Sequence, residues 1–169
     1  QPSGWEKRCP HRHLTYPRTY PAVIMAIHDE QDRLLLGRNS AWGPCRYSVL
    51  AGFVEAGETL ESAVRREVYE EAHITVDRVE YFGSQPWPFP RSLMLAFNGW
   101  THAGEADLAV DGKEMAHAQF FSREELIAAL RAHEIQVPSP TSVAASLIQS
   151  WLGQTFAEVL GMDKYDDAI

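Results

Sequence analysis

The chain has 169 residues, 45% of them hydrophobic and 22% charged, which is typical of one globular domain able to bury a sizeable core. Its 15 Lys and Arg residues against 23 Asp and Glu residues give a net charge of −8, which argues against an extended nucleic-acid-binding face but allows a small anionic substrate bound with a divalent cation. No apolar run is long enough for a membrane span, no N-terminal segment indicates secretion, and Cys9 and Cys45 are typical of reduced thiols in a cytoplasmic protein.

The predicted elements mix strands and helices without a regular strand–helix repeat, which favours an α+β fold. Turn-rich, basic residues 1–20 predict an irregular arm. Strands are expected at 22–27, 34–36, 47–53, 74–82, 93–101 and 115–121, the first two joined as a hairpin by a polar turn. Helices are expected from Thr59 to Ala72, from the capping-box residue Ser122 to about Arg131, and from Thr141 or Ser142 to Leu152.

The first predicted helix carries three glutamates, Glu67, Glu70 and Glu71, at the spacing i, i+3 and i+4, so they share one face. Crowded carboxylates repel each other unless a cation lies among them, and hard oxygen ligands suit Mg²⁺ or Mn²⁺. The alternative is a solvated acidic face in which Arg66 pairs with Glu70.

The segment just before this helix favours the metal site. Residues 50–58 (LAGFVEAGE) bring a glycine-bent backbone and a further carboxylate to the helix N-terminus, where exposed amides attract phosphate. Carboxylates that hold a metal beside a phosphate site indicate phosphoryl chemistry.

The stretch from Gly52 to Ile74 resembles the Nudix box, G-x5-E-x7-R-E-U-x-E-E-x-G-U, in which U is aliphatic. The matching positions are Gly52, Glu58, Arg66, Glu67, Val68, Glu70, Glu71 and Ile74. His73 replaces the second glycine of the box, and we expect it to end the helix with a positive φ at a modest cost in stability. The resemblance implies a Nudix fold, a mixed β-sheet sandwiched between helices.

The resemblance also implies roles for the residues of the box. Glu67 and Glu71 match metal ligands, and Glu70 matches either a third ligand or the group that orients or deprotonates water. Arg66 and Glu58 match a pair that holds those carboxylates in place. The implied reaction is in-line attack of metal-activated water on one phosphorus of a pyrophosphate.

Five further positions match family roles less specifically. The carbonyl of Ala51 matches an additional metal ligand, and so does the carboxylate of Glu114, whose alternative is an exposed loop acid. Tyr16 matches an aromatic residue that closes a nicotinamide or adenine pocket, often across a dimer. Phe53 matches a base-stacking residue or else is a buried strand residue, and Ala144 matches a backbone contact to substrate.

The segment SQPWPFPRS, residues 84–92, has three prolines that hold Trp87 and Phe89 on a stiff, extended backbone. These aromatic side chains either hold a flat ring or fill the core. The segment resembles the signature of the NADH pyrophosphatase branch of the Nudix family, which implies hydrolysis of NAD(H) to NMN(H) and AMP or removal of an NAD cap from RNA. The implied substrate contacts are Gln85, Pro86, Trp87, Pro88, Phe89, Pro90, Arg91 and Ser92.

Family members carry a four-cysteine zinc ribbon before the catalytic domain, and this chain departs from that pattern. Only Cys9-Pro10-His11-Arg12 resembles a zinc knuckle, so we expect no structural zinc in this chain. Either the ribbon has degenerated or its first half lies upstream of Gln1. The expected organisation is an arm at 1–20, which is the remnant of a degenerate zinc-ribbon region, a Nudix hydrolase domain at 21–155 and an acidic tail at 156–169. The resemblance implies a homodimer, and the incomplete ribbon pattern leaves that assembly open.

Three functions remain open from the sequence. The first is hydrolysis of NAD(H) as a small-molecule dinucleotide. The second is the same chemistry on NAD-capped RNA or another nucleoside diphosphate derivative. The third is a sensor that binds a nucleotide without turnover, which the complete set of box glutamates disfavours.

Overall fold

The computed structural model describes residues 4–110 and 112–162 of the chain. Its elements are, in chain order, β1 (Lys7–Arg8), β2 (Leu14–Thr15), β3 (Tyr20–His28), β4 (Leu34–Asn39), β5 (Leu50–Phe53), α1 (Leu60–Ala72), β6 (Arg78–Trp87), β7 (Ser92–Trp100), the 3₁₀ helix η1 (Glu105–Asp107), β8 (Met115–Phe121), α2 (Arg123–Arg131), α3 (Val143–Leu152) and α4 (Phe156–Leu160).

A mixed sheet forms the centre of the molecule. The strand order is β6-β7-β3-β4-β8, and β5 pairs with β3 next to β4. The pairing of β3 with β7 is parallel, whereas the other strand pairs of this sheet are antiparallel. The expected hairpin between β3 and β4 is present, with His28 opposite Leu34.

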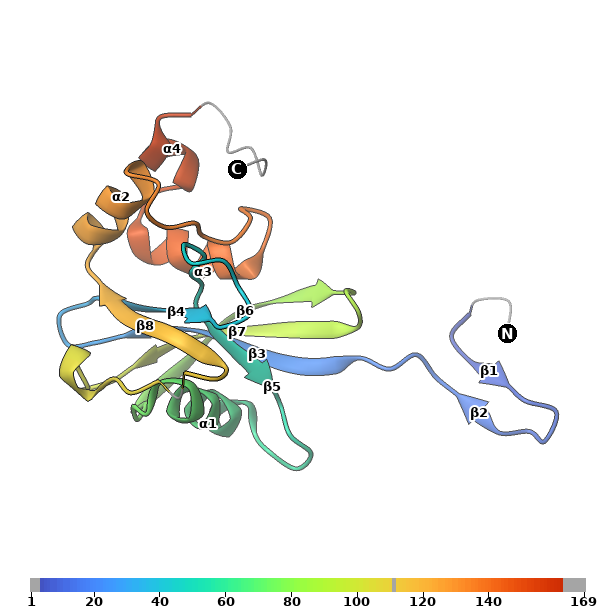
Figure 1. The fold of residues 1–169 in the computed structure, drawn as a ribbon. Coiled ribbons are helices and arrows are strands. Elements are labelled where there is room, and N and C mark those ends of the chain that lie inside the picture. Colours follow the sequence, from blue (N-terminus) through green and yellow to red (C-terminus); the bar gives the residue numbers. More distant parts are fainter. Residues whose placement is uncertain (1–3, 111, 163–169) are drawn as a thin grey trace.

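Helices cover both faces of this sheet, as the α+β prediction required (Figure 1). Along β3, Val23, Met25 and Ile27 face a core that includes α1, whereas Ile24 and Ala26 face a second core built with α2, α3 and α4. This strict alternation shows that β3 is buried on both faces. The predicted arrangement, a mixed sheet sandwiched between helices, is confirmed.

Helix α1 begins and ends at the residues that the sequence indicates. The Oγ1 of Thr59 accepts a hydrogen bond from the amide of Ser62, which satisfies one of the first N–H groups of the helix. At the other end His73 adopts the left-handed conformation, with φ of 59°, and its N–H donates to the carbonyl of Tyr69. The expectation that His73 takes over the helix-ending role of a glycine is confirmed.

The strand expected at 74–82 lies further along the chain. β6 begins at Arg78, extends through the first part of the proline-rich segment to Trp87 and forms a hairpin with β7, in which Pro86 lies opposite Leu93. Proline cannot donate to a strand ladder, and β6 tolerates it because β6 lies at the edge of the sheet.

The C-terminal boundary expected at residue 155 is wrong. Residues 156–160 form α4, capped by Thr155, and Phe156 and Val159 are fully buried in the core with α2 and α3. The sequence pattern of α4 is too short to show helical periodicity, so its burial depends on tertiary contacts. The acidic end of the expected tail, 163–169, lies outside the described residues.

The N-terminal arm is more regular than expected. Strands β1 and β2 form a small hairpin that projects away from the domain (Figure 1). Cys9 lies in its turn, where the Cys9 carbonyl accepts a hydrogen bond from the amide of Arg12, and both Cys9 and Cys45 are free thiols. Within the described part of the chain, no helix is long and apolar enough to cross a membrane.

Because α4 is buried, truncating its core residue Phe156 should strongly destabilise the folded domain. Phe156→Ala should lower the free energy of unfolding by about 3–5 kcal/mol, because it leaves a cavity under α2 and α3. Met162→Ala, just beyond α4 and 36% exposed, is the control and should cost less than about 0.5 kcal/mol. Urea denaturation measures both, and equal small losses would show that α4 is not part of the cooperative domain.

Candidate functional site

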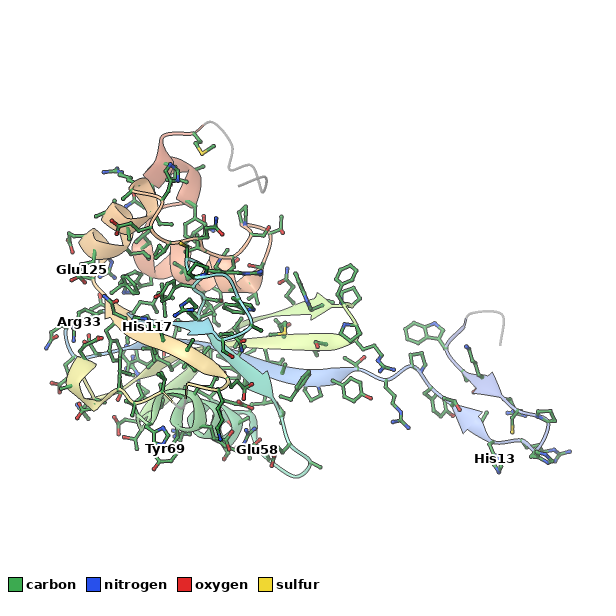
Figure 2. All side chains as sticks on the ribbon, viewed as in Figure 1. His13, Arg33, Glu58, Tyr69, His117 and Glu125 are labelled. Carbon is green, nitrogen blue, oxygen red and sulfur yellow. The ribbon has the colours of Figure 1, made fainter. Side chains whose placement is uncertain are left out.

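The guanidinium group of Arg66 organises the loop and helix of the candidate site. It binds Glu58 in a bidentate manner, with Nε 2.9 Å from Oε1 and Nη2 2.9 Å from Oε2. Nη2 also donates to the carbonyl of Phe53 at 2.8 Å, and Nη1 donates to Glu67 at 2.8 Å and Glu70 at 3.1 Å. One cation therefore joins β5, the following loop and three carboxylates. Figure 2 shows Glu58 in this loop, at the start of α1.

The glycine that opens the motif is required by a close approach. A Cβ atom at Gly52 would lie 1.8 Å from Cδ of Glu67, so only glycine lets that carboxylate lie against β5. Ala51, whose carbonyl was expected to bind metal, is the residue immediately before this contact and pairs with Ile24 of β3.

The electrostatics of the cluster follow from this packing. The hydrogen bonds from Arg66 hold the pKa of Glu58 below its ordinary value, and those bonds raise the pKa of Arg66. Burial raises the pKa of Glu67, an effect that Arg66 opposes and that the charges of Glu70 and Glu114 reinforce. Glu114 comes directly before β8, so the structure brings its charge to Glu67 across 47 residues of sequence.

The donor set fits a hard divalent cation. Glu67 is held in a cradle that a Cβ atom would fill, Oε2 of Glu71 is buried, and 57% of the Glu70 side chain is exposed and able to turn. Carboxylate oxygens that converge in this way need a positive partner beyond Arg66. Among the described residues, no three acidic, His or Cys side chains are already gathered at metal-binding spacing, and Arg66 binds both Glu67 and Glu70.

A second group of predicted residues lines a cavity on the other side of the sheet. Gln85, Trp87 and Ala144 border a space of about 220 Å³ between the β6–β7 hairpin and the start of α3. Trp42 and Arg46 complete this aromatic cavity, and the Arg46 guanidinium lies 5.0 Å from the Trp42 ring. The sequence does not predict either residue as part of a site, because its only signal there is an aromatic residue and a cation four residues apart in a turn-rich segment.

Gln85 ties the two walls of the aromatic cavity together. Its Nε2 donates to the carbonyl of Thr141 at 2.8 Å, and its Oε1 accepts from the amide of Val143 at 2.8 Å. Both ends of the Gln85 amide are therefore engaged by the start of α3 rather than pointing into open space.

The other predicted substrate contacts lie around the tip of the hairpin and the arm. Phe89 is 76% exposed, Phe53 is 61% exposed and Trp87 is 38% exposed, so none of the three fills the core. Pro86, Pro88 and Pro90 are exposed beside them, and Ser92 is half-buried opposite Trp87. Tyr16 and Arg91 line a separate cavity at the base of the arm.

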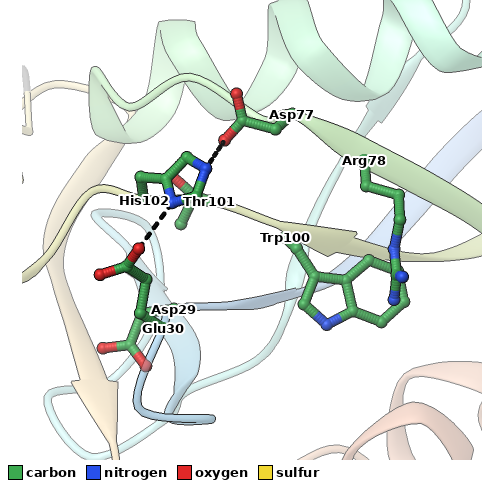
Figure 3. A pocket seen from close by; sticks show the side chains of 7 residues that line it. All are labelled: Asp29, Glu30, Asp77, Arg78, Trp100, Thr101 and His102. Carbon is green, nitrogen blue, oxygen red and sulfur yellow. Dashed lines mark hydrogen bonds and ion pairs between the residues drawn. The ribbon is translucent and has the colours of Figure 1, made fainter.

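A further cavity, of about 340 Å³, lies away from these groups (Figure 3). His102 bridges its two sides, with Nδ1 2.7 Å from Glu30 and Nε2 3.9 Å from Asp77. The hydrogen bond to Glu30 raises the pKa of His102. This cavity lies at the His28 end of β3, whereas Phe53, whose carbonyl accepts from Arg66, pairs with Ala22 near the opposite end, so the cavity is not part of the candidate site.

Comparison with known proteins gives consistent matches. A family model described as the NUDIX domain matches residues 18–139. The protein named NAD-capped RNA hydrolase NudC from Mycobacterium bovis (strain BCG / Pasteur 1173P2) is 44% identical over 158 residues, covering 88% of this chain and 50% of that protein. NAD-capped RNA hydrolase NUDT12 of Macaca fascicularis is 42% identical over 142 residues, covering 82% of this chain and 30% of that protein. The chain thus spans half the length, or less, of these relatives.

Solved structures show the same fold. A crystal structure of a NUDIX hydrolase from Nitrosomonas europaea superposes with a TM-score of 0.66 and 20% sequence identity, covering 87% of this chain and 81% of that chain. At this level of identity the similarity concerns the fold alone.

The Gln85 contacts predict a positioning role. Gln85→Leu should leave the Val143 N–H without its acceptor, increase the hydrogen-exchange rate of that amide and lower the free energy of unfolding by about 1–3 kcal/mol. Gln31→Leu, at an exposed turn, makes the same chemical change as a control and should leave Val143 unaffected. An unchanged hydrogen-exchange rate of the Val143 amide in the Gln85 variant would refute the positioning role of Gln85.

Proposed function

Because the chain belongs to the Nudix family, we propose that it is a pyrophosphohydrolase that cleaves NAD(H) to NMN(H) and AMP. The observation that carries the proposal is the Arg66-centred cluster, in which Glu58, Glu67 and Glu70 are held by one cation beside Gly52. We also propose that the protein works in the cytoplasm as a homodimer.

The reaction breaks one P–O bond of the pyrophosphate as water attacks that phosphorus in line. Glu67, Glu71, Glu114 and the Ala51 carbonyl would hold Mg²⁺ or Mn²⁺, which would supply charge neutralisation and a more acidic water. Arg66 holds Oε2 of Glu70 while 57% of that side chain is exposed, which supports a role for its other oxygen in accepting the proton of the attacking water.

The aromatic cavity supports a dinucleotide that carries a flat ring. Trp87 and Trp42 provide aromatic surfaces, and Gln85 fixes the hairpin that presents Trp87 against Ala144. A planar base or nicotinamide gains stacking energy on such surfaces. NAD-capped RNA ends in the same dinucleotide, and the names of the relatives favour it as a second substrate of the same site.

The reaction is tested with purified protein, NADH and Mn²⁺, in the presence and absence of EDTA, by chromatography of the products. We expect NMNH and AMP in equal amounts, reversible loss of both with EDTA, and near-background turnover in Glu71→Gln. Activity that survives exhaustive chelation would contradict the metal assignment. Faster cleavage of ADP-ribose than of NADH would contradict the dinucleotide assignment. No cleavage by correctly folded protein would favour the nucleotide sensor.

The contact between Gly52 and Glu67 gives a sharper test. Gly52→Ala should lower kcat about 100-fold, because the new methyl group displaces the Glu67 carboxylate by an ångström or more. Gly43→Ala is the matched control, since a Cβ atom there meets nothing within 4 Å. Steady-state kinetics and circular dichroism measure activity and folding together. Full activity in a folded Gly52→Ala protein would show that catalysis does not require the Glu67 carboxylate to lie against Gly52.

A further inference from the structure

The turn that follows β4 contacts the loop that carries Glu114. The N–H of Ser40 donates to the carbonyl of Glu114 at 2.9 Å, and the hydroxyl of Ser40 donates to the carbonyl of Lys113. One serine therefore holds two successive peptide carbonyls of a loop that is 73 residues away in the sequence. These bonds depend on the tertiary pairing of β4 with β8, so no local sequence pattern indicates them.

The register of β4 and β8 explains the position of Ser40. Asn39 lies opposite Met115, after a shift of register that follows Arg38, and the bond from Ser40 to Glu114 extends this pairing one residue beyond both strands. The Met115 side chain is buried. The backbone on both sides of Glu114 is thus fixed, by the buried Met115 on one side and by the bond from Ser40 to the Lys113 carbonyl on the other.

A fixed backbone matters at Glu114 because its side chain is exposed and extends from a loop. The charge of Glu114 nevertheless reaches Glu67, whose carboxylate lies against Gly52 of β5. A ligand on a loop loses conformational freedom when it binds a metal ion, and a backbone that is already ordered lowers that cost. The two Ser40 contacts order the peptide units from which the Glu114 side chain extends.

The turn that carries Ser40 is closed by other contacts. The Oδ1 of Asn39 accepts from the amide of Ala41 at 2.9 Å, and the Asn39 carbonyl accepts from the amide of Trp42 at 3.0 Å. Trp42 lines the aromatic cavity, and Arg46 lies over its ring. Removal of the Ser40 hydroxyl should therefore leave Trp42 in place, which makes an effect on the metal site separable from an effect on the aromatic cavity.

We propose that Ser40 is a positioning residue that holds the Glu114 carboxylate beside Glu67 so that both bind the same divalent metal ion. Ser40 acts through the backbone of residues 113 and 114 and is not itself a ligand. The inference rests on the proposed function and adds to it a residue that orders one of the metal ligands. Groups that orient metal ligands typically change metal affinity or activity by about 10- to 100-fold.

The test measures Mn²⁺ binding by electron paramagnetic resonance, which needs no turnover. Ser40→Ala removes the hydroxyl and should weaken Mn²⁺ affinity about tenfold. Its KM for NADH at saturating Mn²⁺ should stay within about twofold of the wild type, because Trp42 keeps its position. Ser40→Thr keeps the hydroxyl and should restore the Mn²⁺ affinity. Ser40→Gly is a second variant without the hydroxyl, should Ser40→Ala not fold by circular dichroism.

Ser146→Ala is the matched control. The exposed hydroxyl of Ser146 also donates to a backbone carbonyl, that of Ser142 in the same part of the chain, so the chemical change is the same. This variant should bind Mn²⁺ as the wild type does. An affinity loss equal to that of Ser40→Ala would show a general effect of losing a serine hydroxyl and would overturn the proposal.

A double-mutant cycle shows whether Ser40 acts through Glu114. In a Glu114→Gln background, Ser40→Ala should cause no further loss of Mn²⁺ affinity, because the ligand that it orders is already altered. The same loss in both backgrounds would overturn the proposal. An unchanged Mn²⁺ affinity with a raised KM for NADH would also overturn it and would place Ser40 in the support of the aromatic cavity.

The measurements distinguish a failure of this inference from a failure of the proposed function. If the wild type binds Mn²⁺ but does not cleave NADH, the proposed function fails, and the Mn²⁺ affinities still decide the role of Ser40. If the wild type cleaves NADH and the serine variants all bind Mn²⁺ equally well, the function stands and the role of Ser40 is refuted. A wild type that does not bind Mn²⁺ would overturn both.

Discussion

The candidate site depends on one charge arrangement, the Arg66 guanidinium among Glu58, Glu67 and Glu70. Carboxylates this close repel one another, and burial makes the repulsion worse for Glu67. Arg66 balances part of that charge, and all five of its N–H groups donate hydrogen bonds, four to the carboxylates of the cluster and one to the Phe53 carbonyl. The same contacts fix the loop between β5 and α1, so the Arg66 guanidinium determines both the conformation of this loop and the charge balance of the carboxylates.

The sheet places the other parts of the candidate site at the same end as this cluster, with the aromatic cavity on the opposite face. Strand β3 pairs with β5 on one side and with β7 on the other, which places Phe53 and the β6–β7 hairpin at the same end of the sheet. Gln85 then anchors the hairpin to the start of α3, and the aromatic cavity forms between them. A rigid sheet thus positions groups that come from distant parts of the chain.

The sequence predicts those features whose causes are local. Thr59 and His73 mark the ends of α1, and the Ser122–Glu125 capping box marks the start of α2, because each acts within a few residues of itself. The pairing of Arg66 with Glu58 was expected from family resemblance. The partner of Gln85, 56 residues away, and the burial of α4 could not be predicted, because tertiary packing alone determines them.

The net charge of −8 does not predict how the surface of the N-terminal arm interacts with an anion. Charges separated by more than a Debye length, about 8 Å at physiological salt, are largely screened, so an approaching phosphate responds to the groups nearest to it. Around the arm those groups are Lys7, Arg18 and Arg91, whereas the acidic side chains of the cluster lie beyond Phe53 and Tyr20. The fold therefore separates an anion-attracting surface on the arm from a carboxylate cluster that requires a cation.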